Sequence, residues 1–324
     1  MHTITRRSLA VAASLAALTF TVAAHAADFP ERSITVVVPY SPAGGVDIIT
    51  RLVTTAMAQN LNQSIVVDNK PGGGTNIGMQ TVARSAPDGY TLLTASNTLT
   101  TNKALYNKLS YDPDTAFEYI GRIAEAALVV VVNTNSPIKT LDELVKAGKS
   151  KPEALSFGTA GVGSSGHMAS EQLMASGGFK GVHVPYKGGS AAVTDLLGGR
   201  LDFMTINPLE VTGHIAAGKL RPLAVLNDAG SRLLPQVKTA KSQGYDVNAT
   251  VWWGLTAPAG TPAAVIATLN QSLNKAVASP EVQKKLGEIG ASPMTGTPAQ
   301  FAQFVKKESS ELGKLIKTAG IKAD

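Results

Sequence analysis

Short apolar runs alternate with amphipathic segments along most of this chain. Residues 34–38 read Ile-Thr-Val-Val-Val, a composition typical of a strand that is buried on both faces. Pro39 ends the run because proline donates no hydrogen bond to a sheet. Residues 46–61 carry apolar side chains three or four positions apart, such as Ile49 and Val53, which predicts a helix with one buried face.

The turn between this strand and helix is built from small residues. It reads Ser-Pro-Ala-Gly-Gly at residues 41–45. Free N–H groups and the positive end of the helix dipole meet at such a turn, and both suit an anion. An ordinary strand-to-helix turn uses the same residue types, so a purely structural role stays open, although the helix terminus favours a binding site.

The same unit recurs along the chain. Further strands are expected at residues 64–67, 90–95, 155–159, 181–185 and 201–206, with helical segments between them. Alternating strands and helices predict parallel sheets with right-handed crossovers. Ligands of such sheets bind at the carboxyl ends of the strands. The residues at those ends are small or polar, including Ser96, Asn97, the Gly/Ser turn at 160–166, Tyr186, Lys187, Gly188 and Asn207.

The pattern also predicts two lobes. Residues 119–132 form an apolar run long enough to pass from one lobe to a second, and residues 220–226 are interpreted as the return crossing. The expected division is residues 27–125 with 226–324 as lobe 1, and residues 126–225 as lobe 2. Two Rossmann-like α/β lobes joined by a two-segment hinge would enclose a central ligand cleft and close around a small anion.

The N-terminus has the features of a secretory signal peptide over residues 1–26. Arg6 and Arg7 precede an apolar run at 9–23, and Ala-His-Ala at 24–26 forms a small-residue cleavage site. We therefore expect a periplasmic mature protein. The arginine pair leaves the choice between general secretory and twin-arginine export open.

Composition narrows the function. The chain of 324 residues has 29 Lys and Arg against 23 Asp and Glu, and loss of Arg6 and Arg7 with the signal would leave a net charge of about +4. This charge mildly favours anionic small molecules, but runs of basic residues that would bind nucleic acid are absent from the sequence. There is no cysteine, which excludes thiolate catalysis and zinc–thiolate sites.

Catalytic patterns are absent as well. His167, His183 and His214 show no metal-ligand spacing, and no nucleophile–base pair is evident. The glycines at 72–78 lack the Gly-Lys-Ser/Thr of a phosphate-binding loop. We expect no enzyme activity, no cofactor and no metal. Asp47 either complements the helix dipole or orients the glycine turn or a bound water.

Several short motifs in one order resemble the Bug/TctC family, the periplasmic solute-binding components of tripartite tricarboxylate transporters. The resemblance covers residues 29 to 317. The motifs are Phe29-Pro30-Glu31-Arg32, Pro42–Asp47, Asn69-Lys70-Pro71-Gly72, Ala86–Leu93, Tyr111-Asp112-Pro113, His183–Gly188, Asp195–Gly199 and Ala257–Pro262.

This resemblance implies a type II periplasmic-binding-protein fold and a carboxylate ligand held by main-chain N–H groups and ordered water. It also implies delivery of that ligand to membrane transporter subunits; a ligand sensor that feeds a signalling receptor is the alternative. A monomer is expected. The candidate ligand-binding residues are Tyr40, Ser41, Ala43, Gly44, Gly45, Asp47, Ser96, Asn97, Thr159, Ala160, Gly161, Ser164, Ser165, His167, Tyr186, Lys187, Gly188 and Asn207.

The chain departs from the family pattern after the strand at 201–204. The family often carries an Asp-Asn pair there, whereas Thr205-Ile206-Asn207 contains no acid. An acid at this place would pair with a ligand amine. We therefore hypothesise from the sequence that a plain dicarboxylate or aromatic carboxylate is bound in preference to an amino acid.

Overall fold

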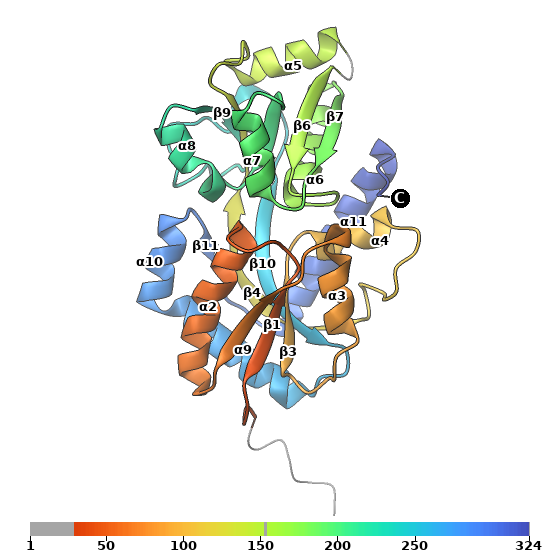
Figure 1. Ribbon diagram of the computed structural model, residues 1–324, viewed down its shortest axis with the longest axis vertical. Helices are drawn as coiled ribbons and strands as arrows, with labels where there is room; N and C mark the ends of the chain where they lie inside the picture. The colour runs from red at the N-terminus through yellow and green to blue at the C-terminus, as the bar shows by residue number, and fades with distance from the viewer. Residues whose placement is uncertain (1–28, 152–153, 324) are drawn as a thin grey trace, which may run out of the picture.

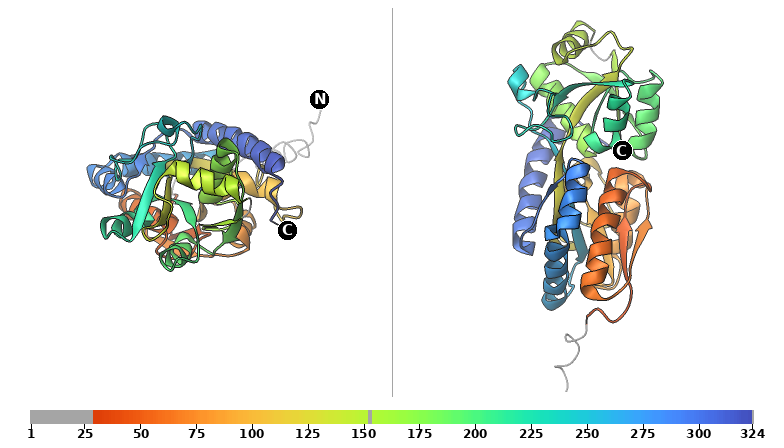
Figure 2. Two further views of the ribbon diagram at one scale, coloured as in Figure 1. Left: turned by 90° about the horizontal axis from the view of Figure 1, so that it is seen from above. Right: turned by 90° about the vertical axis from the view of Figure 1, so that its left-hand side faces the viewer.

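The computed structural model describes residues 29–151 and 154–323, so the predicted signal peptide lies outside the described residues. Two α/β lobes stack along the long axis of the molecule (Figure 1). Each lobe is built on one sheet with helices against it, and the right-hand view of Figure 2 shows one lobe above the other. This arrangement is the two-lobed fold that the sequence predicts.

Lobe 1 is organised around a six-stranded sheet in the order β11-β4-β10-β3-β1-β2. β1 pairs in parallel with both β2 and β3, as the strand–helix alternation predicts, while β10 runs antiparallel between β3 and β4. Its elements are β1 (Ile34–Val38), α2 (Gly45–Leu61), β2 (Ile65–Asn69), η1 (Gly73–Thr75), α3 (Asn76–Ala83), β3 (Thr91–Ala95), α4 (Thr98–Leu105), β4 (Phe117–Ala127), β10 (Thr250–Pro258), α9 (Ala263–Ala278), α10 (Pro280–Glu288), β11 (Ser292–Pro293) and α11 (Pro298–Ala319).

Lobe 2 is organised around a five-stranded sheet in the order β7-β6-β8-β5-β9. β6 pairs in parallel with β7 and β8, and β5 pairs antiparallel with β8 and β9. Its elements are β5 (Val129–Asn133), α5 (Leu141–Ser150), β6 (Leu155–Thr159), α6 (Ser165–Gly177), β7 (Gly181–Pro185), α7 (Gly189–Leu197), β8 (Phe203–Ile206), η2 (Pro208–Glu210), α8 (Thr212–Ala216), β9 (Leu220–Val225) and η3 (Lys241–Gln243).

The chain crosses between the lobes twice. The first crossing is the apolar run that the sequence singled out, where β4 continues through Leu128 into β5. The second differs from the expectation, because β9 pairs with β5 inside lobe 2 instead of leading out of it. The chain then remains with lobe 2: Val225 N–H donates to Lys238 at 3.0 Å, and Leu234 packs in the lobe 2 core.

The chain returns to lobe 1 only at Ala249, which leads directly into β10. The amide of Leu226 donates to Leu128 at 2.8 Å and the amide of Ala249 donates to Leu226 at 2.5 Å, so the two crossings lie side by side. We therefore propose residues 29–127 with 249–323 as lobe 1, and residues 128–248 as lobe 2. This proposed boundary differs from the predicted one at 225/226 because periodicity does not show which sheet an irregular segment packs against.

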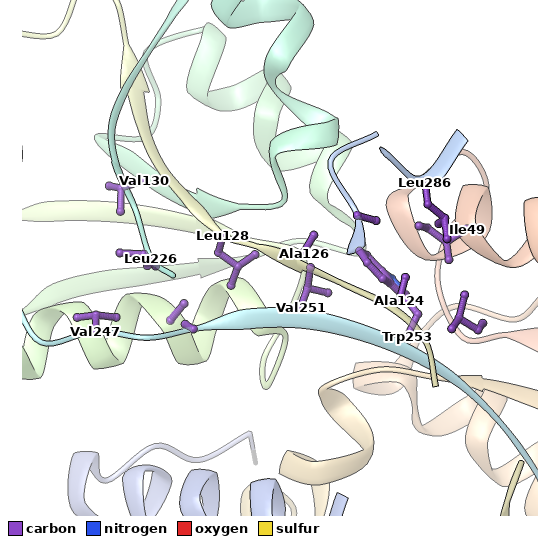
Figure 3. Packing of buried hydrophobic residues seen from close by; sticks show 14 of the residues in the cluster. Ile49, Ala124, Ala126, Leu128, Val130, Leu226, Val247, Val251, Trp253 and Leu286 are labelled. Carbon is purple, nitrogen blue, oxygen red and sulfur yellow. The ribbon is translucent and has the colours of Figure 1, made fainter. Parts of the chain in front are cut away.

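The largest apolar core is continuous between the lobes and passes through the two chain crossings. Figure 3 shows Leu128 and Leu226 at the crossings, with Ala124 and Trp253 toward lobe 1 and Val130 toward lobe 2. All of these side chains belong to one cluster of buried residues that extends into the cores of both lobes. The hinge is thus a packed part of the protein interior.

Side-chain caps mark the start of α5, α6, α10 and α11. Thr140 caps α5 by accepting from the amide of Glu143 at 3.1 Å. Thr75, which precedes α3, makes no capping hydrogen bond through its side chain, and its backbone is left-handed with φ 75°. The sequence interpretation omitted α10, which begins after the capping residue Ser279.

Candidate functional site

A pocket lies between the lobes at the carboxyl ends of β1, β3, β6 and β8. Both lobes contribute to its wall, which is what a ligand cleft of this fold requires. Its lining residues are Tyr40, Ser41, Pro42, Gly44, Gly45, Val46, Ser96, Ala160, Ser164, Ser165, Gly166, Gly188, Gly189, Ser190, Met204, Thr205, Ile206, Asn207, Glu210, Val251 and Trp253.

Three helix N-termini converge on this pocket. Helix α2 begins at Gly45, α6 at Ser165 and α7 at Gly189, and all three residues line the wall. The first-turn N–H groups of a helix have no intrahelical acceptor, and the helix dipole adds positive potential at the same place. Gly44 and Gly188 precede α2 and α7 without any side-chain cap, so these ends stay open to a ligand.

Asp47 holds the first of these loops in shape. Its carboxylate accepts a 2.9 Å hydrogen bond from the amide of Ala43, whose φ of 62° is unusual for a residue with a side chain. Arg51 and Asn69 also donate to Asp47, at 3.0 Å each. Burial raises the pKa of Asp47, but the hydrogen bonds from Arg51, Ala43 and Asn69 outweigh it, and the pKa is lowered from 3.8.

The loop at the start of α6 is held by histidines. His167 Nδ1 accepts from the amide of Gly163 at 3.1 Å, and His183 Nε2 lies 2.7 Å from the hydroxyl of Thr159. The two imidazole rings stack with centroids 3.8 Å apart. Burial, and secondarily the charge of His167, lower the pKa of His183 to about 3, so His183 is neutral at physiological pH. Both histidines support the loop structurally.

The predicted site residues separate into three groups. Ten line the pocket: Tyr40, Ser41, Gly44, Gly45, Ser96, Ala160, Ser164, Ser165, Gly188 and Asn207. A neighbouring cavity, which shares Tyr40, Ala160 and Ser164 with the pocket, is lined by the predicted residues Gly161, Tyr186 and Lys187.

The remaining predicted residues lie outside both cavities. Ala43, Asp47, Thr159 and His167 support the loops from behind. Asn97 turns away from the pocket, because its amide donates to Glu308 on α11 at 3.2 Å and to the carbonyl of Thr250 at 3.3 Å.

The sequence interpretation missed Glu210, the one acidic residue on the pocket wall among the described residues. It is the last residue of η2, four positions beyond the end of β8. The available signal was the cap Asn207, whose side chain accepts from the amide of Leu209 at 3.1 Å and starts a helical turn. An acid in a turn at the carboxyl end of a strand faces the ligand edge of the sheet. The hypothesis of a ligand without an amine was drawn from residues 205–207 alone and did not take Glu210 into account.

The two adjacent tryptophans pack in the core, with 0% of Trp252 and 1% of Trp253 exposed. Trp253 also lines the pocket.

Among the described residues, no group of three or more His, Cys, Asp or Glu side chains is placed to hold a metal ion. Nor does any helix in the described ranges have the length and hydropathy to span a bilayer.

Two α/β lobes hinged around a cleft, with helix N-termini facing the cleft, define a two-lobed solute-binding protein. Comparison with known proteins supports this class. The chain belongs to the TctC family, described as the tripartite tricarboxylate transporter family receptor, whose model matches residues 49–321.

Solved structures of the same class are similar over most of their length. The periplasmic binding protein BugD is 31% identical with a TM-score of 0.85, over 91% of this chain and 99% of BugD. Rpa4515 of R. palustris, solved with adipate, is 31% identical with a TM-score of 0.87, over 91% and 99% of the two chains. MatC of Rhodopseudomonas palustris, with bound malate, is 30% identical with a TM-score of 0.84, over 89% and 100%.

These matches confirm the predicted family and its two-lobed fold. The protein is a solute-binding protein of the TctC/Bug family, whose characterised members are periplasmic binding proteins and not enzymes.

Proposed function

We propose that the protein captures a carboxylated small molecule between its lobes in the periplasm and delivers it to a membrane transporter of the tripartite tricarboxylate type. The observation that carries this proposal is the convergence of the N-termini of α2, α6 and α7 on one interlobe pocket. A carboxylate at that point would receive several charge-assisted hydrogen bonds from backbone N–H groups, at about 1.5–3 kcal/mol each before the costs of binding are subtracted.

The comparisons support the ligand class. Adipate and malate, bound to Rpa4515 and MatC, are both dicarboxylates. The described part of this chain also offers a pocket wall rich in glycine, serine and backbone groups, which suits a ligand held mainly by main-chain contacts and water. The family description supports the transporter as the partner that receives the ligand.

A thermal-shift screen followed by calorimetry tests the proposal. We expect at least one di-, tri- or aromatic carboxylate to raise the melting temperature, because a ligand at a hundred times its Kd stabilises the folded protein by about 2.7 kcal/mol. A complete panel of carboxylates without any shift would count against it. Transport by cells that lack the gene then separates uptake from sensing: lost uptake supports delivery, whereas intact uptake with a lost transcriptional response supports a sensor.

A further inference from the structure

The carboxyl group of Glu210 lies between the two lobes, next to a glycine of each lobe. Gly189 on α7 lies so close that a Cβ there would overlap Oε2 of Glu210. On the other lobe, a Cβ at Gly45 would lie 3.7 Å from Oε1 of Glu210 and 3.2 Å from the amide nitrogen of Asn207. The absence of a side chain at Gly189 is therefore what leaves room for the carboxyl group, which lies against Gly45 of the other lobe at ordinary contact distance.

The carboxyl group is incompletely satisfied in this position. Oε2 of Glu210 is buried without a hydrogen-bond partner among the described residues. Leaving a buried acceptor unpaired costs about 1–3 kcal/mol, and more when it is charged. Burial also raises the pKa of Glu210 to about 7, so its charged form is disfavoured until a donor arrives.

Other charged groups on the surrounding elements do not supply that donor. On α2, Asp47 pairs with Arg51 at 3.0 Å, and on α7, Asp195 pairs with Arg200 at 2.7 Å. His214 lies on α8, beyond η2. Burial is the sole cause of the raised pKa of Glu210. Among the described residues, no ion pair or side-chain hydrogen bond complements Glu210.

We propose that Glu210 binds an amino group of the ligand, so that the pocket selects carboxylates that carry an amine over the corresponding plain carboxylates. The helix N-termini supply the positive side of the pocket and Glu210 supplies the negative side, which matches a molecule bearing one carboxylate and one ammonium group. An ammonium group donates up to three hydrogen bonds and carries the compensating charge. This assignment rests on the proposed carboxylate-binding function and reverses the ligand preference inferred from the sequence.

A plain dicarboxylate would bring a second negative charge, instead of a positive one, close to Glu210. Its second carboxylate would share a confined pocket with Glu210, and two like charges at close range favour protonation of one of them. Binding of an amino carboxylate should therefore release a proton from Glu210, and its affinity should rise between pH 6 and pH 8. Binding of a plain dicarboxylate should take up a proton, and its affinity should fall over the same interval.

The test compares matched ligand pairs by calorimetry: aspartate with succinate, glutamate with glutarate, and phenylalanine with 3-phenylpropionate. The variants are Glu210→Gln, which keeps the side-chain volume, and Glu281→Gln, which removes the same charge from an exposed site on α10. We expect wild-type protein to bind the amino member of at least one pair at least tenfold more tightly. Glu210→Gln should lose that preference, and Glu281→Gln should retain it.

Proton release in two buffers of different ionisation enthalpy gives a readout on the wild-type protein that is independent of any variant. Plain carboxylates that bind as tightly as their amino partners, or a preference that survives Glu210→Gln, would overturn the role of Glu210 and leave the proposed function standing. If no carboxylate of either kind binds, the proposed function fails and the role of Glu210 falls with it.

Discussion

The hydroxyl of Ser41 donates a 3.0 Å hydrogen bond to the carbonyl oxygen of Lys187, which lies 146 positions away in the chain. Ser41 belongs to the glycine-rich turn of lobe 1 and Lys187 to the loop after β7 in lobe 2. Gly188 lies at the same contact, since a Cβ there would be within van der Waals range of Ser41, 3.8 Å from its Cβ. The lobes therefore touch beside the pocket, whose wall includes Ser41 and Gly188.

Replacing Ser41 with alanine should weaken ligand retention. The substitution removes a contact made only when the lobes are together, and one neutral hydrogen bond contributes about 0.5–1.5 kcal/mol. We expect ligand dissociation to accelerate about two- to tenfold, as measured by stopped-flow fluorescence. Ser33→Ala is the matched control, because the Ser33 hydroxyl donates to Ser64 within lobe 1. Equal dissociation rates in both variants would contradict a role for this contact in closure.

Gly44→Val should abolish binding while the fold survives. The φ of Gly44 is −80°, which any residue adopts, and a Cβ there meets only the carbonyl oxygen of Ser41, at 3.6 Å. The added side chain would instead occupy the space in front of the α2 N-terminus. We expect the affinity to fall at least about a hundredfold, by calorimetry, with a nearly unchanged melting temperature.

The control for this variant is Gly287→Val on α10, where a Cβ would have no neighbour within 4 Å. It should leave the affinity unchanged. Wild-type affinity in Gly44→Val would show that the ligand does not bind at the α2 N-terminus.

Asp47→Asn should destabilise the protein in a pH-dependent manner. Asp47 is 4% exposed and accepts hydrogen bonds from three partners, so loss of its charge should cost about 1.5–3 kcal/mol at pH 7. The pKa of Asp47 is lower in the folded protein than in the unfolded chain. Its stabilisation is therefore fully present above the unfolded pKa near 3.8 and is lost as the pH falls through the folded value.

Urea unfolding of Asp47→Asn and wild type at several pH values measures this difference. The gap should be largest near neutrality and should close at acidic pH. Asp68→Asn provides the control, because Asp68 forms an exposed ion pair with Lys70 and should contribute little. A gap between Asp47→Asn and wild type that is independent of pH would mean that the ionised carboxylate is not what holds the turn.

Glu308 should titrate near neutral pH and report through Trp252. Burial raises the pKa of Glu308 to about 7, while hydrogen bonds from Trp252 and Thr100 partly oppose the shift. Because the folded pKa lies above the unfolded value of 4.5, the stability of the wild type should fall as the pH rises from about 4.5 to 7. Indole Nε1 of Trp252 donates to Glu308, so tryptophan fluorescence should change with a midpoint near pH 7.

Glu308→Gln should remove both the fluorescence midpoint and the decline in stability, whereas Glu311→Gln, at a more exposed position on the same helix, should remove neither. A midpoint that persists in Glu308→Gln would assign the titration to another group.

The first strand–turn–helix unit was predictable because its signals are local. Val36 and Ile49 lie at the expected periods of a strand and a helix, and Gly44 and Gly45 lie between them where a helix must begin. The crossing through Leu128 was predictable as well, because a strand in a soluble protein is rarely apolar over so many consecutive positions. These features depend on neighbours in the sequence.

Features that depend on distant partners were not predictable. Nothing near Asp47 indicates that it would accept a hydrogen bond from Asn69, 22 positions later. The same limitation applies to Asn97, whose partner Glu308 comes 211 positions later. Glu210 was missed because the room for its carboxyl group depends on Gly189, and its place at the interlobe pocket depends on the approach of Gly45 from the other lobe.

The apolar core that passes through Leu128 and Leu226 has a consequence for how the molecule denatures. Each half of the chain would expose part of this shared interior if it stood alone, and lobe 1 is assembled from two separated segments. Calorimetry should therefore record a single cooperative melting transition. An excised lobe 2 should be insoluble. The two lobes of this protein therefore form one thermodynamic unit.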